Sequence, residues 1–317
     1  MYLAELRLPS RSAAEDALEA AINKRSCYNN VYPFGVFDHW EALSIPLYPL
    51  TIFYGGNGSG KTTLLNLLGE KLELERRSVY NRTPFFQPFV ELCHCTTGKR
   101  WHEGKVLTSD DVFDDLLDQR SLNQGIDLAR TEVLQEYRSL REEHFQMQSL
   151  EDFDHLKKVV LAQRKKGSGS DFVRRTLGGN LRGRSNGETA LHYFTHQIQE
   201  DGLYLLDEPE NSLSPAFQQE LAGFLADSVR FFRCQLILST HSPFLLAMPG
   251  AVVYDLDGWR DTDQEEIQPS PWVQLPAVQA YHAFFQAHAQ ELEYASSSPQ
   301  EREREEKGAR GCQREKN

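Results

Sequence analysis

The sequence predicts an α/β fold organised around a phosphate-binding loop. A short apolar run over 50–54 precedes a glycine-rich stretch, and leucines at helical spacing follow that stretch. Two further apolar runs, over 203–206 and 236–238, lead directly into polar side chains, as the buried strands of an open sheet do. The chain therefore carries a strand–loop–helix unit and two later strands, a pattern typical of an α/β protein.

The glycine-rich stretch has the spacing of a phosphate-binding loop: a glycine, four residues, then Gly-Lys-Thr. Glycines let the backbone curl, so that successive N–H groups converge on phosphates at a helix N-terminus. Lys61 would reach the β- and γ-phosphates, and the Thr62 hydroxyl would bind Mg²⁺. The alternative is a plain glycine-rich turn before an amphipathic helix. The residues predicted to bind nucleotide are Gly55, Gly56, Asn57, Gly58, Ser59, Gly60, Lys61, Thr62 and Thr63.

The composition is that of an ordinary globular protein: the chain has 317 residues, 40% of them hydrophobic and 25% charged. No apolar run approaches the length of a membrane span, and the first residues lack the layout of a signal peptide. Five cysteines without framework spacing favour a reducing compartment. The net charge of −12 opposes nucleic-acid binding by the surface as a whole, which leaves a local basic groove as the alternative. We therefore expect a cytoplasmic protein without membrane insertion.

The chain before and after the loop predicts further elements. An edge strand is expected over 2–8, a helix over 13–22, and an irregular strand over 79–92, where two prolines interrupt an aromatic run. Gln87 in this last segment is a candidate further Mg²⁺ or water ligand, of the kind that links two lobes in some ATPases. The alternative for Gln87 is a plain surface residue.

The middle of the chain is polar and has helical periodicity over 109–166. It predicts a pair of helices, each burying one face and too short for a long coiled-coil arm. A basic cluster over 164–184 stands out from the acidic background and would either meet phosphates or form a solvated face.

The expected organisation is one head over 1–295 followed by a charged tail without stable structure. Its parts are a nucleotide-binding core over about 1–98 and 200–260, a helical lobe over about 99–199, a C-terminal helix over about 277–295 and the tail over 296–317.

The second half supplies candidate catalytic groups. The apolar run over 203–206 ends in Asp207 and Glu208. Asp207 would hold Mg²⁺ through water, and Glu208 would orient and deprotonate an attacking water. A later strand delivers His241 to the carboxyl edge of the sheet, where the γ-phosphate would lie. For the two acids, a mere strand terminus is the alternative.

Four motifs occur in the order found in ABC-type ATPases, over 57–62, 185–188, 207–214 and 239–243. Within these ATPases the chain resembles the soluble branch: RecF-like and SMC-like heads and the stand-alone AAA-family ATP-binding proteins, including the ATPase parts of OLD-like proteins. The resemblance covers about 32–256. It implies a P-loop NTPase fold, an ABC-ATPase-like head with a helical lobe inserted between the phosphate loop and the signature motif.

The resemblance also implies a homodimer that encloses two ATP molecules. The signature residues Ser185, Asn186, Gly187 and Glu188 would then contact the γ-phosphate held by the partner copy. His241 would match the family's switch histidine. The signature reads Ser-Asn-Gly-Glu rather than the Leu-Ser-Gly-Gly-Gln of transporters, and the loop after the glutamate ends in Ser214 instead of an aspartate.

The leading hypothesis is an enzyme, a Mg²⁺-dependent ATPase whose ATP-bound homodimer drives or gates a partner in bacterial DNA repair or phage defence. One alternative is the nucleotide-binding subunit of an ABC transporter, against which the signature weighs. Another is a slow-turnover, ATP-gated scaffold for an effector nuclease. The expected partners are ATP, a second copy, and an effector protein or DNA. Because no acidic cluster follows His241, we expect the chain alone to cut no DNA.

Overall fold

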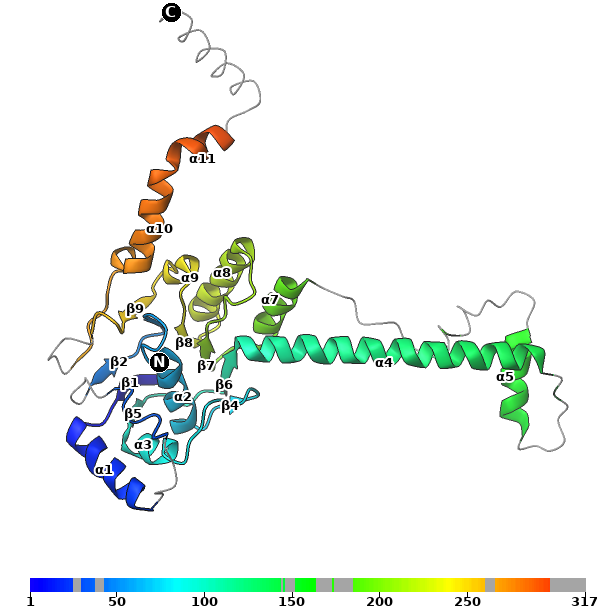
Figure 1. The fold of residues 1–317 in the computed structure, drawn as a ribbon, viewed down its shortest axis with the longest axis horizontal. Coiled ribbons are helices and arrows are strands. Elements are labelled where there is room, and N and C mark those ends of the chain that lie inside the picture. The colour runs from blue at the N-terminus through cyan, green and yellow to red at the C-terminus, as the bar shows by residue number, and fades with distance from the viewer. Residues whose placement is uncertain are drawn as a thin grey trace, which may run out of the picture.

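A six-stranded parallel sheet forms the centre of the protein (Figure 1). The computed structural model describes residues 1–24, 30–37, 43–143, 145, 152–163, 173, 185–259 and 266–296. The strand order is β4 (Glu75–Arg76), β6 (Glu103–Thr108), β7 (Gly202–Asp207), β8 (Gln235–Ser239), β3 (Leu50–Tyr54) and β9 (Val252–Asp255). This architecture confirms the predicted α/β fold class.

Both faces of the sheet are buried, which is why its strands are apolar throughout instead of alternating with polar residues. On β7, Leu203 and Leu205 face a core that includes the leucines of α2 (Lys61–Lys71). Tyr204 and Leu206 face a second core with α7 (Asn186–Gln197) and α8 (Pro215–Phe231). The central strands are thereby held rigidly, and their carboxyl ends are fixed relative to one another.

A small antiparallel sheet lies beside this core and corrects two expectations. Its order is β2 (Ser44–Pro46), β1 (Leu3–Arg7) and β5 (His94–Thr97), so the predicted edge strand near the N-terminus is central. The segment expected as an irregular strand ends instead in α3 (Phe86–Leu92). Pro88 is tolerated there because it lies in the first turn, where no helical N–H bond is lost.

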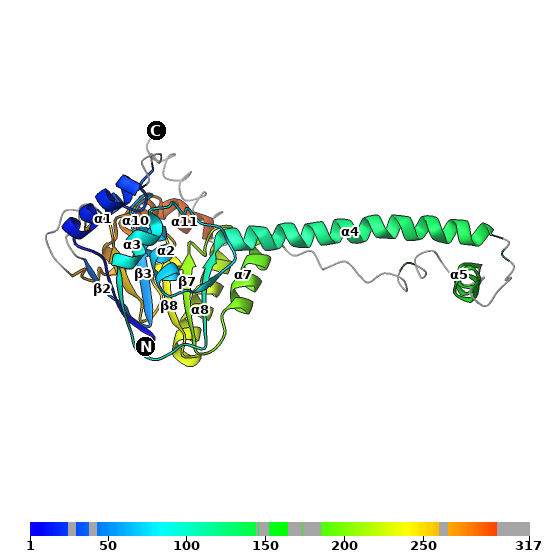
Figure 2. The same ribbon diagram turned by 90° about the horizontal axis from the view of Figure 1, so that it is seen from below.

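A long helix projects from the head (Figures 1 and 2). Helix α4 (Ser109–Glu142) has 34 residues and is therefore roughly 50 Å long. It packs on the body near Val112 and, at its far end, through Tyr137 and Leu140 against α5 (Phe153–Gln163). The expected pair of helices is confirmed, but the expectation that they are too short for a long arm is wrong, because a capping box of Thr108 and Asp111 starts one uninterrupted helix of 34 residues.

The stretch predicted as a helical lobe also contains strand β6, which pairs with β7 inside the main sheet. Its helical part thus begins at Ser109, directly after a core strand. The arm is consequently joined to the carboxyl edge of the sheet without a linker.

The C-terminal region leaves the body after the short helix η2 (Trp272–Gln274). The single helix expected there is two, α10 (Pro276–Ala287) and α11 (Ala289–Ser296), separated at His288. No helix among the described residues is long and apolar enough to cross a membrane. The basic cluster over 164–184 and the tail beyond 296 lie outside the described residues, apart from the position at 173.

Candidate nucleotide-binding site

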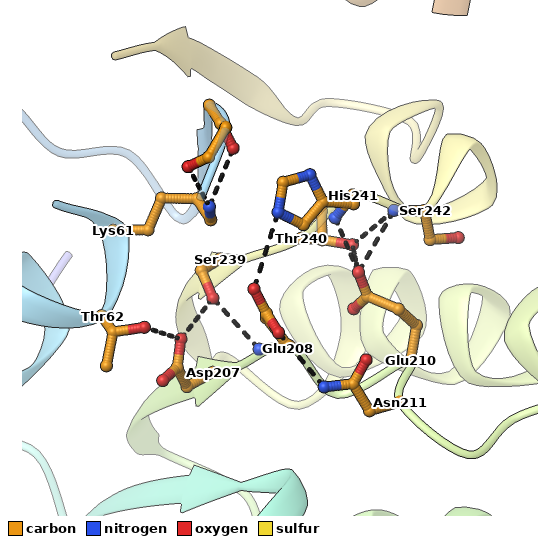
Figure 3. A network of polar contacts seen from close by, with 12 residues as sticks. Lys61, Thr62, Asp207, Glu208, Glu210, Asn211, Ser239, Thr240, His241 and Ser242 are labelled. Carbon is orange, nitrogen blue, oxygen red and sulfur yellow. Dashed lines mark hydrogen bonds and ion pairs between the residues drawn. The ribbon is translucent and has the colours of Figure 1, made fainter. Parts of the chain in front are cut away.

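The candidate site lies where parallel strands end at one edge of the sheet (Figure 3). Strand β3 leads into the phosphate-binding loop, β7 into Glu208, and β8 into His241. In the strand register Asp207 is opposite Ser239, and Phe53 is opposite Ser239 from the other side. Residues far apart in sequence therefore meet, as ligand-binding groups do at the carboxyl edge of open α/β sheets.

The loop has the backbone shape that its glycines permit. Gly58 and Gly60 have positive φ angles of 82° and 98°. A Cβ on Gly60 would lie 2.7 Å from the ring of Phe37, so neither the angle nor the space admits a side chain. The turn carrying Phe37 also holds Tyr32, whose hydroxyl donates to Thr63 Oγ1 at 3.0 Å. An aromatic turn thus covers the loop and the start of α2.

Lys61 is buried at the first position of α2. Its ammonium group donates to the carbonyls of Gly55 at 2.8 Å and Gly56 at 3.1 Å. Burial lowers the pKa of Lys61, while the carboxylates of Glu208 and Asp207 oppose that shift. A cation is therefore held inside the loop, where it would meet the phosphates of a nucleotide.

Asp207 and Thr62, the predicted Mg²⁺ ligands, are hydrogen-bonded to each other. Asp207 Oδ1 accepts from Ser239 Oγ at 2.5 Å and from Thr62 Oγ1 at 3.1 Å. Burial raises the pKa of Asp207, and the two hydroxyl donors offset part of that rise. One carboxylate and one hydroxyl fit Mg²⁺, which takes oxygen ligands and completes its shell with phosphates and water.

Glu208 has an unusual backbone, with a φ of 45°. Its N–H donates to the carbonyl and the hydroxyl of Ser239, at 3.2 and 3.0 Å. Its side chain accepts from Asn211 Nδ2 at 3.1 Å and lies 3.6 Å from His241 Nε2. A non-glycine residue held in the left-handed region is typical of a functional position, and here that conformation aims the carboxylate at the site.

His241 lies across the site from Lys61. Burial lowers the pKa of His241 and the charge of Lys61 lowers it further, while Glu208 and Asp257 oppose the shift, so the neutral form of the imidazole is favoured. Its Nε2 is buried without a hydrogen-bond partner in the described part of the chain. A neutral ring nitrogen facing Glu208 is suited to contact a further polar group at this point.

Two other predicted sites are not part of this cluster. Gln87 is exposed on α3, on the side away from the buried Phe86 and Phe89, and corresponds to the surface-residue alternative. Ser185 caps α7 through a capping box, in which its Oγ accepts from the Glu188 N–H at 3.2 Å. The prediction that this loop opens a helix is confirmed, and the loop is exposed.

The fold brings three further residues to the site, of which the sequence offers only Glu210 a role, as the first alternative to Glu208 for the base. Ser109, the first residue of α4 directly after β6, accepts from Asn211 Nδ2 at 3.4 Å. Glu210 is buried beside His241, and Asp257, after β9, accepts a hydrogen bond from the Gly56 N–H. Of these three residues, Asp257 and Glu210 could have been noticed in the sequence, because each is an acid that shortly follows an apolar run.

Replacing Asp257 by asparagine is expected to strengthen ATP binding. Its carboxylate is one of the charges acting on both Lys61 and His241, so it lies where it would repel a triphosphate. Removing one negative charge should lower the Kd for ATP roughly threefold to tenfold, and that for ADP by less. Titration calorimetry measures both values. Asp227→Asn on the exposed face of α8 is the control for net charge, and unchanged or weaker ATP binding in Asp257→Asn would contradict the repulsion.

Residues 179–247 match a family model described as "AAA domain, putative AbiEii toxin, Type IV TA system". Among solved structures, the chain is similar to a metal-chelate type ABC transporter in an inward-facing conformation, at 16% identity over 90% of each chain with a TM-score of 0.37. It is also similar to a nucleotide-free ATP-binding cassette from an ABC transporter, at 15% identity over 89% of this chain and 99% of that chain with a TM-score of 0.36. No curated protein matches the chain. The parallel sheet with its phosphate-binding loop has the fold of a P-loop NTPase, and residues 179–247 are similar to the AAA domain of that family model.

Proposed function

We propose that the protein is a Mg²⁺-dependent ATPase that converts ATP and water to ADP and phosphate. The observation that carries this proposal is the convergence of Lys61, Asp207, Glu208 and His241 at one edge of the sheet. The Lys61 ammonium would donate charge-assisted hydrogen bonds to the β- and γ-phosphates and neutralise part of their negative charge. Mg²⁺, held by Thr62 and Asp207, would supply charge stabilisation on the phosphate oxygens when bound.

Glu208 is the proposed general base. The oxygen of a water would attack the γ-phosphorus, its proton would pass to the Glu208 carboxylate, and the bond to the β-phosphate oxygen would break. His241 lies 3.6 Å from that carboxylate and would contact the γ-phosphate through its neutral imidazole. Asn211 holds the other oxygen of Glu208 and keeps the carboxylate oriented.

We further propose that two copies enclose two ATP molecules. Ser185, Asn186, Gly187 and Glu188 lie at an exposed helix start, where N–H groups and the helix dipole favour an anion. A Cβ on Gly187 would lie 2.8 Å from the Phe217 ring at the start of α8, so this loop packs closely on the segment after Glu208. Through this contact, a change at the nucleotide site of one copy would move its signature loop, which faces the nucleotide site of the second copy.

The dimer would gate a partner. We propose that the arm formed by α4 and α5 connects the nucleotide site to that partner. Its first residue, Ser109, contacts the Asn211 side chain that also holds Glu208. The description of the matching family names a toxin of a type IV TA system, which supports a role in defence. An effector protein or DNA as the partner is part of this proposal.

Ser185→Arg is the test of the shared site, made in a Glu208→Gln background that retains ATP. Glu208→Gln protein should form dimers in saturating ATP, and the added Ser185→Arg should leave it monomeric by sedimentation velocity, because the long side chain fills the space of the partner's phosphate. Loss of the cap alone costs about 1 kcal/mol of stability. His196→Arg, at the exposed far end of the same helix, is the control for bulk and charge. Glu208→Gln protein that stays monomeric with ATP bound would refute the shared site.

A further inference from the structure

Glu210 is a buried carboxylate whose one oxygen holds a whole loop. Its side chain is only 9% exposed. Its Oε1 accepts hydrogen bonds from Thr240 Oγ1 at 2.7 Å, from the His241 N–H at 2.6 Å and from the Ser242 N–H at 3.2 Å. Three consecutive residues after β8 are therefore tied to one atom of the loop after β7 (Figure 3).

Burying a carboxylate at this position costs more free energy than burying an apolar side chain of similar size. Burial raises the pKa of Glu210, because the charged form loses its hydration. Its Oε2 is buried and has no hydrogen-bond partner among the described residues. An apolar side chain could fill the same space without stranding an oxygen, so the carboxylate is explained by the donors that it collects rather than by the core.

The loop that Glu210 holds carries His241, whose own side chain is weakly held. Its Nε2 has no hydrogen-bond partner in the described part of the chain and lies 3.6 Å from Glu208, and the ring meets the Tyr54 ring only edge-on, with centroids 6.1 Å apart. The position of the ring is therefore set mainly through its main chain. Glu210 bonds to that main chain, and it also stands two residues after Glu208.

We infer that Glu210 is a positioning residue that fixes His241 relative to Glu208. The inference rests on the proposed ATPase function and deepens it, because it names the group that sets the distance between the base and the histidine. Glu210 itself does not contact the reacting atoms. Its carboxylate accepts hydrogen bonds from the three donors of the loop over 240–242. This gives a physical reason for an acid at this position, two residues after Glu208.

Glu210→Gln tests this role. The amide oxygen keeps the shape of the acceptor, but it binds the three donors more weakly and places an NH₂ group where Oε2 has no partner. The kcat for ATP should fall about tenfold while the Kd for ATP stays within about twofold, because binding uses the phosphate loop and turnover needs the aligned pair.

The second readout is the titration of His241 by NMR, assigned with a His241→Gln spectrum. The groups acting on its charge are Lys61 on α2, Glu208 after β7 and Asp257 after β9. A loosened loop admits water, so the pKa of His241 should rise toward its ordinary value in Glu210→Gln. This readout does not depend on turnover, so it separates the two proposals. A wild-type protein without ATPase activity would contradict the proposed function. The titration would still show whether Glu210 positions His241.

Asp111→Asn is the matched control. Asp111 is buried as well, and one of its oxygens accepts from the Thr108 N–H at 2.7 Å while the other has no hydrogen-bond partner among the described residues. It holds the start of α4 instead of the His241 loop. This variant should lower the Tm and leave the pKa of His241 where it is. The inference is overturned if Glu210→Gln changes neither kcat nor the His241 titration, or if Asp111→Asn moves that titration equally.

Discussion

Lys61→Ala is expected to abolish ATP binding at concentrations where the wild-type protein is saturated. A neutral methyl group replaces the cation that would sit between the β- and γ-phosphates. Each hydrogen bond to a charged group contributes about 1.5–3 kcal/mol, so losing contacts to two phosphates should raise the Kd by about 100-fold or more. The same change removes the two bonds to the Gly55 and Gly56 carbonyls, which hold the loop in its closed shape.

Titration calorimetry or a fluorescent ATP analogue measures this loss. Lys71→Ala is a matched control, because Lys71 stands at the other end of the same helix and donates to the Val90 carbonyl instead. It should bind ATP as the wild type does. ATP affinity close to wild type in Lys61→Ala would remove the assignment of 55–62 as the phosphate-binding loop.

Glu208→Gln is expected to bind ATP and hydrolyse it at least about 100-fold more slowly, which is the usual contribution of a general base. The amide keeps the size of the side chain and can still accept from Asn211 through its oxygen. It cannot take the proton of the attacking water. Binding and turnover therefore separate in this variant, unlike in Lys61→Ala, where both are lost together.

Single-turnover hydrolysis with excess enzyme isolates the chemical step. Glu220→Gln, on the exposed face of α8, is the control for loss of one carboxylate. A Glu208→Gln rate within a few-fold of wild type would place the base elsewhere. Duplex DNA should stay intact with Mg²⁺ or Mn²⁺ in all these variants, and cleavage that survives Glu208→Gln would reveal a separate nuclease site.

Those parts of the site that depend only on neighbouring residues could be predicted from the sequence. The strand before Gly55, the glycines and the helix at Lys61 are one local unit, and the structure confirms it. The start of α7 at Ser185 is likewise local, since a capping box needs only a serine and a glutamate three residues later. The strands that lead to Asp207 and His241 were predictable because both faces of the sheet are buried and their apolar runs are continuous.

Other features depend on how segments distant in the sequence pack together. The aromatic segment ending in α3 reads as a strand by composition, but packing of Phe86 and Phe89 into the core makes it a helix. The sequence did not predict the length of α4, because the buried residues of this helix lie near its two ends. Periodicity in its middle, which buries little, does not indicate what the helix packs against. Glu210 and Asp257 acquire their partners across 31 and 201 residues of chain. Contacts of that range depend on the order of strands in the sheet, which sequence spacing does not encode.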